Sequence, residues 1–110
     1  MSKITESARG EMCQIRYPGI CNHNPETTVW AHANGSAAGK GIGMKSNDLL
    51  GAYSCSCCHD AYDRRNFLVV PIYSREQVEL MFWEGHARSL VLLIEKGIVR
   101  VERGTVVVQA

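Results

Sequence analysis

Nine consecutive residues in the middle of the chain, beginning at position 55, hold three thiols, an imidazole and two carboxylates. Within them, Cys55-x2-Cys58 places two thiolate ligands on one tight turn, which is the spacing of half a tetrahedral zinc site. The chain has only two cysteines outside this segment, Cys13 and Cys21. Together the four thiolates would form the closed coordination of a structural zinc.

Other ligand sets stay open at this stage. His23 or Cys57 could replace one of the four cysteines, and buried cysteines without a metal are the third interpretation. In the four-cysteine set Cys57 is the spare thiol. A zinc ion held by four thiolates has no open coordination position, so it stabilises a fold without acting as a catalyst. Any chemistry would therefore have to come from neighbouring residues.

Two of the four histidines are candidates for that chemistry. His32 ends the best strand pattern of the first half, residues 27–32, and His59 stands near the start of a predicted helix. One imidazole would act as a general base on water, and the other would hold a divalent ion against a phosphate. Asp63 follows His59 by four residues, on the same helix face, and could be a second ligand of that ion.

Local sequence signals predict the elements around these histidines. The polar residues 1–10 are expected to form a flexible tail, and residues 33–46 a long glycine-rich loop. A short helix is expected next, capped by Ser46 or Asn47 and including Tyr53. The helix that carries His59 would then run from about residue 58 to residue 65.

The C-terminal part is predicted to form a helix and a hairpin. Ser74 and Gln77 have the spacing of a capping box, so a helix should begin there and run to about Lys96. Residues 98–103 and 105–108 follow as two strands that meet at an arginine-glycine turn. The sequence therefore predicts an α+β fold.

Composition limits the class of protein. With 110 residues, the chain is expected to form one domain over 11–110, with a core at 11–66 and an extension at 67–110. The net charge of +1 provides no global attraction to nucleic acid. No secretory signal and no membrane span is apparent, so a cytoplasmic location is expected. In that reducing compartment, cysteine pairs indicate metal binding before disulfides.

The order of these motifs resembles that of the HNH endonucleases, also called ββα-metal or His-Me finger nucleases. It is most similar to the small prophage-encoded YbcO-like family and to the recombination-linked Ref nuclease. The resemblance covers roughly residues 11–66 and rests on four segments, at 18–22, 29–32, 43–48 and 55–60.

The resemblance implies a zinc-stabilised ββα-metal core and a phage- or prophage-derived DNA endonuclease that needs Mg²⁺ or a similar ion. His32 would be the general base, His59 would bind the catalytic metal, and Asn47 or Asp48 would orient the ring of His32. Cleavage would leave a 5′-phosphate and a 3′-hydroxyl. The sequence departs from the common pattern at Ala31, where many members have an acidic residue or a histidine that binds the metal. It also departs in the distance from the asparagine to the cysteine pair, which is longer here.

Contacts to DNA phosphates would come from basic residues near the cysteine cluster. The candidates are Lys40, Lys45, Arg64 and Arg65. For the last two, a solvated helix end whose charge suits the helix dipole is an equal alternative. The small net charge suggests that a recombination or replication protein recruits the nuclease to DNA. The apolar strand at 105–108 leaves an edge that could pair with a second copy in a homodimer.

Two other classes compete with the nuclease interpretation. A non-catalytic zinc module for nucleic acid or protein keeps the four-cysteine site and treats His32 and His59 as packing residues, and Ala31 favours it. A nucleobase deaminase would need a glutamate two residues after its histidine and a proline before Cys55, and neither is present. Residues 35–41 are one residue short of a phosphate-binding P-loop and lack its serine or threonine.

Overall fold

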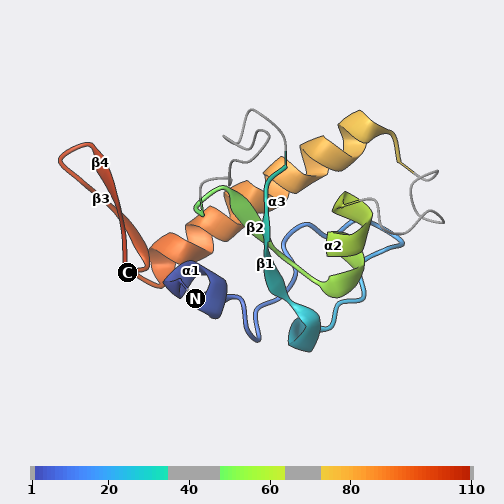
Figure 1. The fold of residues 1–110 in the computed structure, drawn as a ribbon, viewed down its shortest axis with the longest axis horizontal. Coiled ribbons are helices and arrows are strands. Elements are labelled where there is room, and N and C mark those ends of the chain that lie inside the picture. Colours follow the sequence, from blue (N-terminus) through green and yellow to red (C-terminus); the bar gives the residue numbers. More distant parts are fainter. Residues whose placement is uncertain (1, 35–47, 64–72, 110) are drawn as a thin grey trace.

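The computed structural model describes residues 2–34, 48–63 and 73–109. Its elements, in chain order, are α1 (Lys3–Ser7), the 3-10 helix η1 (Pro25–Thr27), β1 (Val29–His32), β2 (Gly51–Ser54), α2 (Ser56–Tyr62), α3 (Arg75–Glu95), β3 (Val99–Glu102) and β4 (Thr105–Val108). Figure 1 shows α3 running along the molecule, with β1, β2 and α2 beside it and the β3–β4 hairpin projecting from its C-terminal end. The predicted α+β class is confirmed.

β1 and β2 form an antiparallel pair in which His32 lies opposite Gly51. The strand predicted to end at His32 is present, although it begins only at Val29 because η1 occupies the preceding residues. β2 leads directly into α2, so the central elements follow one another as strand, strand and helix.

The prediction of a short helix that includes Tyr53 is wrong for the described residues, because Tyr53 lies in β2. Its predicted cap, Ser46 or Asn47, lies outside the described residues. Tyr53 packs edge-on against the ring of Trp30 in β1, with ring centroids 5.3 Å apart. At Gly51 a Cβ would stand 2.5 Å from the Trp30 Nε1. This close pairing across the sheet outweighs the local helix signal.

The long helix α3 begins and ends as predicted. The Ser74 hydroxyl accepts from the Gln77 N–H at 3.1 Å, and the Gln77 side chain accepts from the Ser74 N–H at 2.8 Å, which completes the capping box. Lys96 is the C-cap, and Gly97 follows with a φ of +74°. No helix among the described residues is both long enough and apolar enough to cross a membrane.

The free edge of β2 is covered by α3. The Ser89 hydroxyl accepts from the Tyr53 N–H at 3.0 Å and donates to the Gly85 carbonyl at 2.7 Å. Gly85 itself lies against the N-terminal loop, where a Cβ would be 2.9 Å from the Ile15 Cα. Phe82 of α3 stacks on Tyr62 of α2, with ring centroids 3.9 Å apart. α3 therefore belongs to the packed core rather than to an appendage.

The flexible tail predicted for residues 1–10 is contradicted by α1. Ser2 caps this helix, and its side chain accepts from the Thr5 N–H at 3.2 Å. Ile4 and Ala8, four residues apart on one face, are both buried. They join a cluster with Trp30, Tyr53, Leu93 and Val99. Two apolar residues at helical spacing thus anchor a segment that is otherwise polar.

The predicted C-terminal hairpin is confirmed. β3 and β4 pair antiparallel around Arg103 and Gly104, whose φ angles of 52° and 78° are those that a tight hairpin turn requires. Val101 and Val106 lie opposite each other and are more than half exposed. Pairing of this hairpin with a second copy stays a prediction.

The Ser89 hydroxyl supplies a first test of the fold. Ser89→Ala would leave the buried Tyr53 N–H without its acceptor, so we expect the free energy of unfolding to fall by about 1–3 kcal/mol. Urea denaturation followed by circular dichroism would measure it. Ala87→Ser, the opposite change on the exposed face of the same helix, should stay within about 0.5 kcal/mol. Equal stability of Ser89→Ala and the parent would show that this bond does not support β2.

Candidate metal centre and active site

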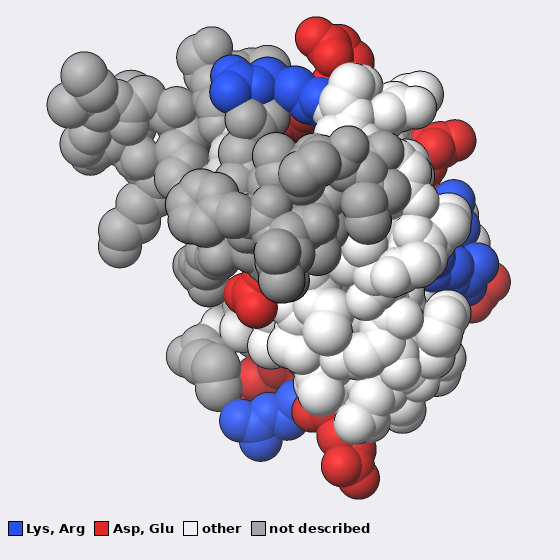
Figure 2. Space-filling model, turned by 90° about the vertical axis from the view of Figure 1, so that its right-hand side faces the viewer, with Lys and Arg blue, Asp and Glu red and all other residues white. Residues whose placement is uncertain are grey.

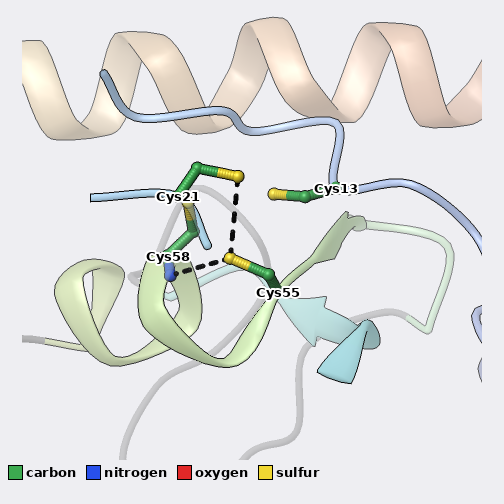
Figure 3. A group of neighbouring side chains, drawn as sticks. All are labelled: Cys13, Cys21, Cys55 and Cys58. Carbon is green, nitrogen blue, oxygen red and sulfur yellow. Dashed lines mark hydrogen bonds between the residues drawn. The ribbon is translucent and has the colours of Figure 1, made fainter. Parts of the chain in front are cut away.

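Four cysteine sulfur atoms gather at one point, all within 4.8 Å of one another. They belong to Cys13 and Cys21 in the N-terminal loop and to Cys55 and Cys58 at the start of α2, and Figure 3 shows the two pairs facing each other. The Sγ atoms of Cys21 and Cys55 are 3.8 Å apart. Two thiolates on a tetrahedral zinc with Zn–S bonds of 2.3 Å are also about 3.8 Å apart. The donor set therefore fits a metal ion such as zinc.

Local backbone geometry places these ligands. Cys55 is the N-cap of α2, and its sulfur accepts from the Cys58 N–H at 3.4 Å, so one helix start positions both ligands. The helix thus begins two residues earlier than predicted. In the N-terminal loop, the Cys13 sulfur accepts from the Arg16 N–H at 3.5 Å. The chain then turns at Gly19, with a φ of +79°, and brings Cys21 back beside the pair.

Burial and mutual hydrogen bonding shift the pKa values of three thiols in the cluster in different directions. A hydrogen bond from Cys58 lowers the pKa of Cys13 to about 4 against the opposing effect of burial. The same bond, together with burial, raises the pKa of Cys58. Burial raises the pKa of Cys21 to about 11. A cation at the centre would supply the charge that lets the remaining thiols ionise.

The structure brings together the four-cysteine set rather than a set that includes His23 or Cys57. Cys57 is exposed and its sulfur accepts from the Asn22 side chain at 3.6 Å, outside the four-sulfur group. His23 reaches the sulfur of Cys21 through Nδ1 at 3.7 Å but is not a member of that group either.

His32, at the end of β1, is paired with a carboxylate. Its Nε2 lies 2.6 Å from the Asp48 Oδ1, and the two side chains are 39% and 44% exposed. Burial alone would raise the pKa of Asp48, but hydrogen bonds from Ser2 and His32 hold it below the usual value. Of the two residues predicted to orient His32, Asp48 makes the contact, while Asn47 lies outside the described residues.

His59 on α2 is paired with a second carboxylate. Its Nε2 lies 3.2 Å from the Asp63 Oδ2, one helical turn away. Adjacent ligands on an octahedral cation at about 2.1 Å are about 3.0 Å apart, so this pair has the separation of two ligands of one divalent ion. It has equally the separation of a simple ion pair.

Asn34 links the segment after β1 to the His59–Asp63 pair, a role that the sequence reasoning missed. Its side-chain amide donates to the Asp63 Oδ1 at 3.0 Å, and its backbone N–H donates to the Tyr62 hydroxyl at 2.8 Å. Asn34 follows His32 by two residues, so it ties the end of β1 to the end of α2. In the sequence, only its position two residues after His32 could have indicated this role of Asn34. Among the described residues, no hydrogen bond, ion pair or ring contact joins the two histidines to each other.

Ala31 is the residue at which the resemblance to HNH nucleases would place a metal ligand. It is completely buried, in the same apolar cluster as Ala52, Cys58 and Ala61. A carboxylate at this position would have to lose its hydration within that cluster. The missing ligand therefore reflects a position that belongs to the core in this chain.

On the face drawn in Figure 2, the described charged residues do not form one basic area. Figure 2 shows lysines and arginines as separate groups beside aspartates and glutamates, around an uncharged surface. The four residues predicted to contact DNA lie outside the described residues. They are Lys40, Lys45, Arg64 and Arg65.

Comparison with known proteins gives consistent matches. The model of the family described as "Putative nuclease YbcO" matches residues 2–98. Proteins called "Putative nuclease YbcO" from Escherichia coli K12 and "Putative nuclease ybcO" from Enterobacteria phage 82 are each 40% identical to this chain over 100 residues. Each match covers 91% of this chain and 99% of the relative.

A solved structure agrees with the fold. The "Structure of a putative bacteriophage protein from Escherichia coli str. K-12 substr. MG1655" superposes with a TM-score of 0.67 at 37% sequence identity. The match covers 84% of this chain and 96% of that one. The relatives are described as "Putative nuclease" and the solved structure as a "putative bacteriophage protein", and neither description names a mechanism. The HNH mechanism, the similarity to the Ref nuclease and the residue roles therefore stay predictions.

Proposed function

We propose, from the premise that this chain belongs to the YbcO family of nucleases, that it is a divalent-metal-dependent DNA endonuclease with an HNH-type mechanism. The observation that carries the proposal is the pairing of His32 and of His59 each with its own carboxylate on consecutive strand, strand and helix elements. The four-cysteine cluster supports it by tying the start of α2, and with it His59, to the N-terminal loop.

His32 is the proposed general base. The Asp48 carboxylate lies at hydrogen-bond distance from Nε2, so it would accept the Nε2 proton and leave Nδ1 as the acceptor for a proton from water. The lowered pKa of Asp48 keeps this carboxylate ionised at neutral pH, the form that can accept. Deprotonated water would then attack the phosphorus atom in line with the leaving 3′-oxygen.

His59 and Asp63 are the proposed ligands of the catalytic cation. When bound, Mg²⁺ or a similar ion would stabilise the charge that develops on the scissile phosphate and the leaving oxygen. Mg²⁺ sites often use one or two protein carboxylates together with water and substrate phosphate, so a small protein ligand set suits it. Asn34 would hold Asp63 in place through its side-chain amide. The proposed products are a 5′-phosphate and a 3′-hydroxyl.

Weak intrinsic DNA binding is part of the proposal. A net charge of +1, with the described cations dispersed on the face drawn in Figure 2, offers little sequence-independent attraction to DNA. We therefore propose that a recombination or replication protein already on DNA recruits this nuclease.

Cleavage of supercoiled plasmid would test the function. The parent should convert plasmid to nicked or linear DNA with Mg²⁺ or Mn²⁺ and lose this activity in EDTA, while His59→Ala should lose at least about 100-fold in rate. Agarose gels resolve the three DNA forms. Binding without cleavage of single- or double-stranded DNA by the parent would favour the non-catalytic zinc module instead. Cleavage that persists unchanged in EDTA would contradict the proposed metal.

A further inference from the structure

A surface depression lies beside His59 and Asp63, the two proposed ligands of the catalytic cation. It is lined by Asn34, Tyr62, Asp63, Arg75 and Glu79. These residues come from the segment after β1, the end of α2 and the start of α3, so three elements meet there. The depression shares Asp63 with the His59 pair, and any group bound in it would be a neighbour of the proposed cation.

Among the described residues, Arg75 is the one cation that lines the depression. It is exposed at the first position of α3 and makes no ion pair or side-chain hydrogen bond among the described residues. Three other arginines in the described chain are already engaged, and Arg16 among them donates to the Cys13 carbonyl at 3.1 Å. Arg88 donates to the Gln14 carbonyl at 2.9 Å, and Arg100 pairs with Glu102 at 2.6 Å. The planar guanidinium of Arg75 is therefore available for a ligand, and it suits two oxygens of a phosphate.

The Tyr62 hydroxyl offers a second donor in the same depression. It accepts the Asn34 N–H at 2.8 Å, which leaves its own proton for another acceptor. A phenol is protonated at neutral pH, so this proton is available for donation. A phosphate oxygen is the kind of acceptor that a guanidinium and a phenol would share.

We infer that this depression binds a DNA backbone phosphate adjacent to the scissile one, held by the Arg75 guanidinium with the Tyr62 hydroxyl beside it. The inference rests on the proposed function, because the cation held by His59 and Asp63 would define where the scissile phosphate lies. The carboxylates of Asp63 and Glu79 oppose an anion here. A divalent ion on Asp63 would offset one of them, so binding at this subsite should be stronger with Mg²⁺ than in EDTA.

Salt-dependent binding of a duplex would test this subsite. The background is His32→Ala, which keeps the depression and the cation ligands while lacking the proposed base. Fluorescence anisotropy in Mg²⁺ at several salt concentrations gives the slope of log affinity against log salt. Adding Arg75→Ala should lower this slope by about 1, the value for one lost phosphate contact. Arg75→Lys should keep most of the slope, because it keeps the charge.

Arg100→Ala is the matched control, since Arg100 is an exposed arginine on the distant hairpin and is paired within its own strand. It should leave the slope unchanged. An unchanged slope in Arg75→Ala, an equal loss in Arg100→Ala, or no DNA binding at all would overturn the subsite. Cleavage by the parent reports separately on the proposed function. If the parent cleaves DNA but Arg75→Ala leaves the salt slope unchanged, the subsite alone is rejected. If Arg75→Ala lowers the slope but the parent does not cleave, the nuclease mechanism alone is rejected.

Discussion

Replacing His32 with alanine is expected to slow DNA cleavage by roughly 10²–10⁴-fold, the usual contribution of a positioned general base. The fold should survive, because this side chain is 39% exposed and, within the described part of the chain, bonds through its ring to Asp48 alone. Single-turnover cleavage in Mg²⁺ or Mn²⁺ would measure the rate. Thermal unfolding of the same preparation would show that the variant is folded.

Asp48→Asn separates the base from the residue that orients it. The amide keeps the shape of the carboxylate but is neutral, so its hydrogen bond to the Nε2 proton of His32 would be weaker. We expect the cleavage rate to fall by about tenfold, less than in His32→Ala. DNA binding by both variants should match the parent. A His32→Ala variant that cleaves at the parent rate would show that another group deprotonates the water.

Replacing Cys55 with serine is expected to abolish metal binding and to unfold the domain at ordinary temperature. Cys55 is both a member of the four-sulfur group and the N-cap of α2, and it is completely buried. A structural zinc contributes about 10 kcal/mol or more of apparent binding free energy to folding, comparable with the whole stability of a small domain. Elemental analysis should find about one zinc per parent chain and almost none in the variant.

Cys57→Ser is the matched control, since it makes the same chemical change two residues away on an exposed side chain. It should keep the zinc and shift the melting temperature by no more than a few degrees. Equal zinc content in the two serine variants would contradict the four-cysteine site. Zinc lost only with Cys57 would favour the alternative ligand set that includes this residue.

Features with strong local signals could be predicted from the sequence. Ser74 and Gln77 mark the start of α3 by their spacing alone, and the structure completes both bonds of the capping box. The hairpin follows from Arg103-Gly104, because a tight turn needs residues that tolerate a positive φ. The four cysteines were predictable from their number and spacing.

Features that depend on distant contacts could not be predicted. β2 looked like a capped helix, and only the fit of Gly51 and Tyr53 against Trp30 makes it a strand. Likewise α1 depends on burial of Ile4 in a cluster built largely from residues far along the chain. Asn34 carried no motif, since its role appears only when α2 lies beside the end of β1.

The position of α3 has a consequence for the order in which the molecule can form during synthesis. Cys58 is the last cysteine of the four-sulfur group and leaves the ribosome before α3 does. Yet β2 and the loop before Arg16 depend on Ser89, Gly85 and Arg88 of that helix. A nascent chain could therefore capture its metal early while the sheet that carries His32 still lacks its support. The proposed cleavage activity would then arise only after α3 has been synthesised and packed against β2.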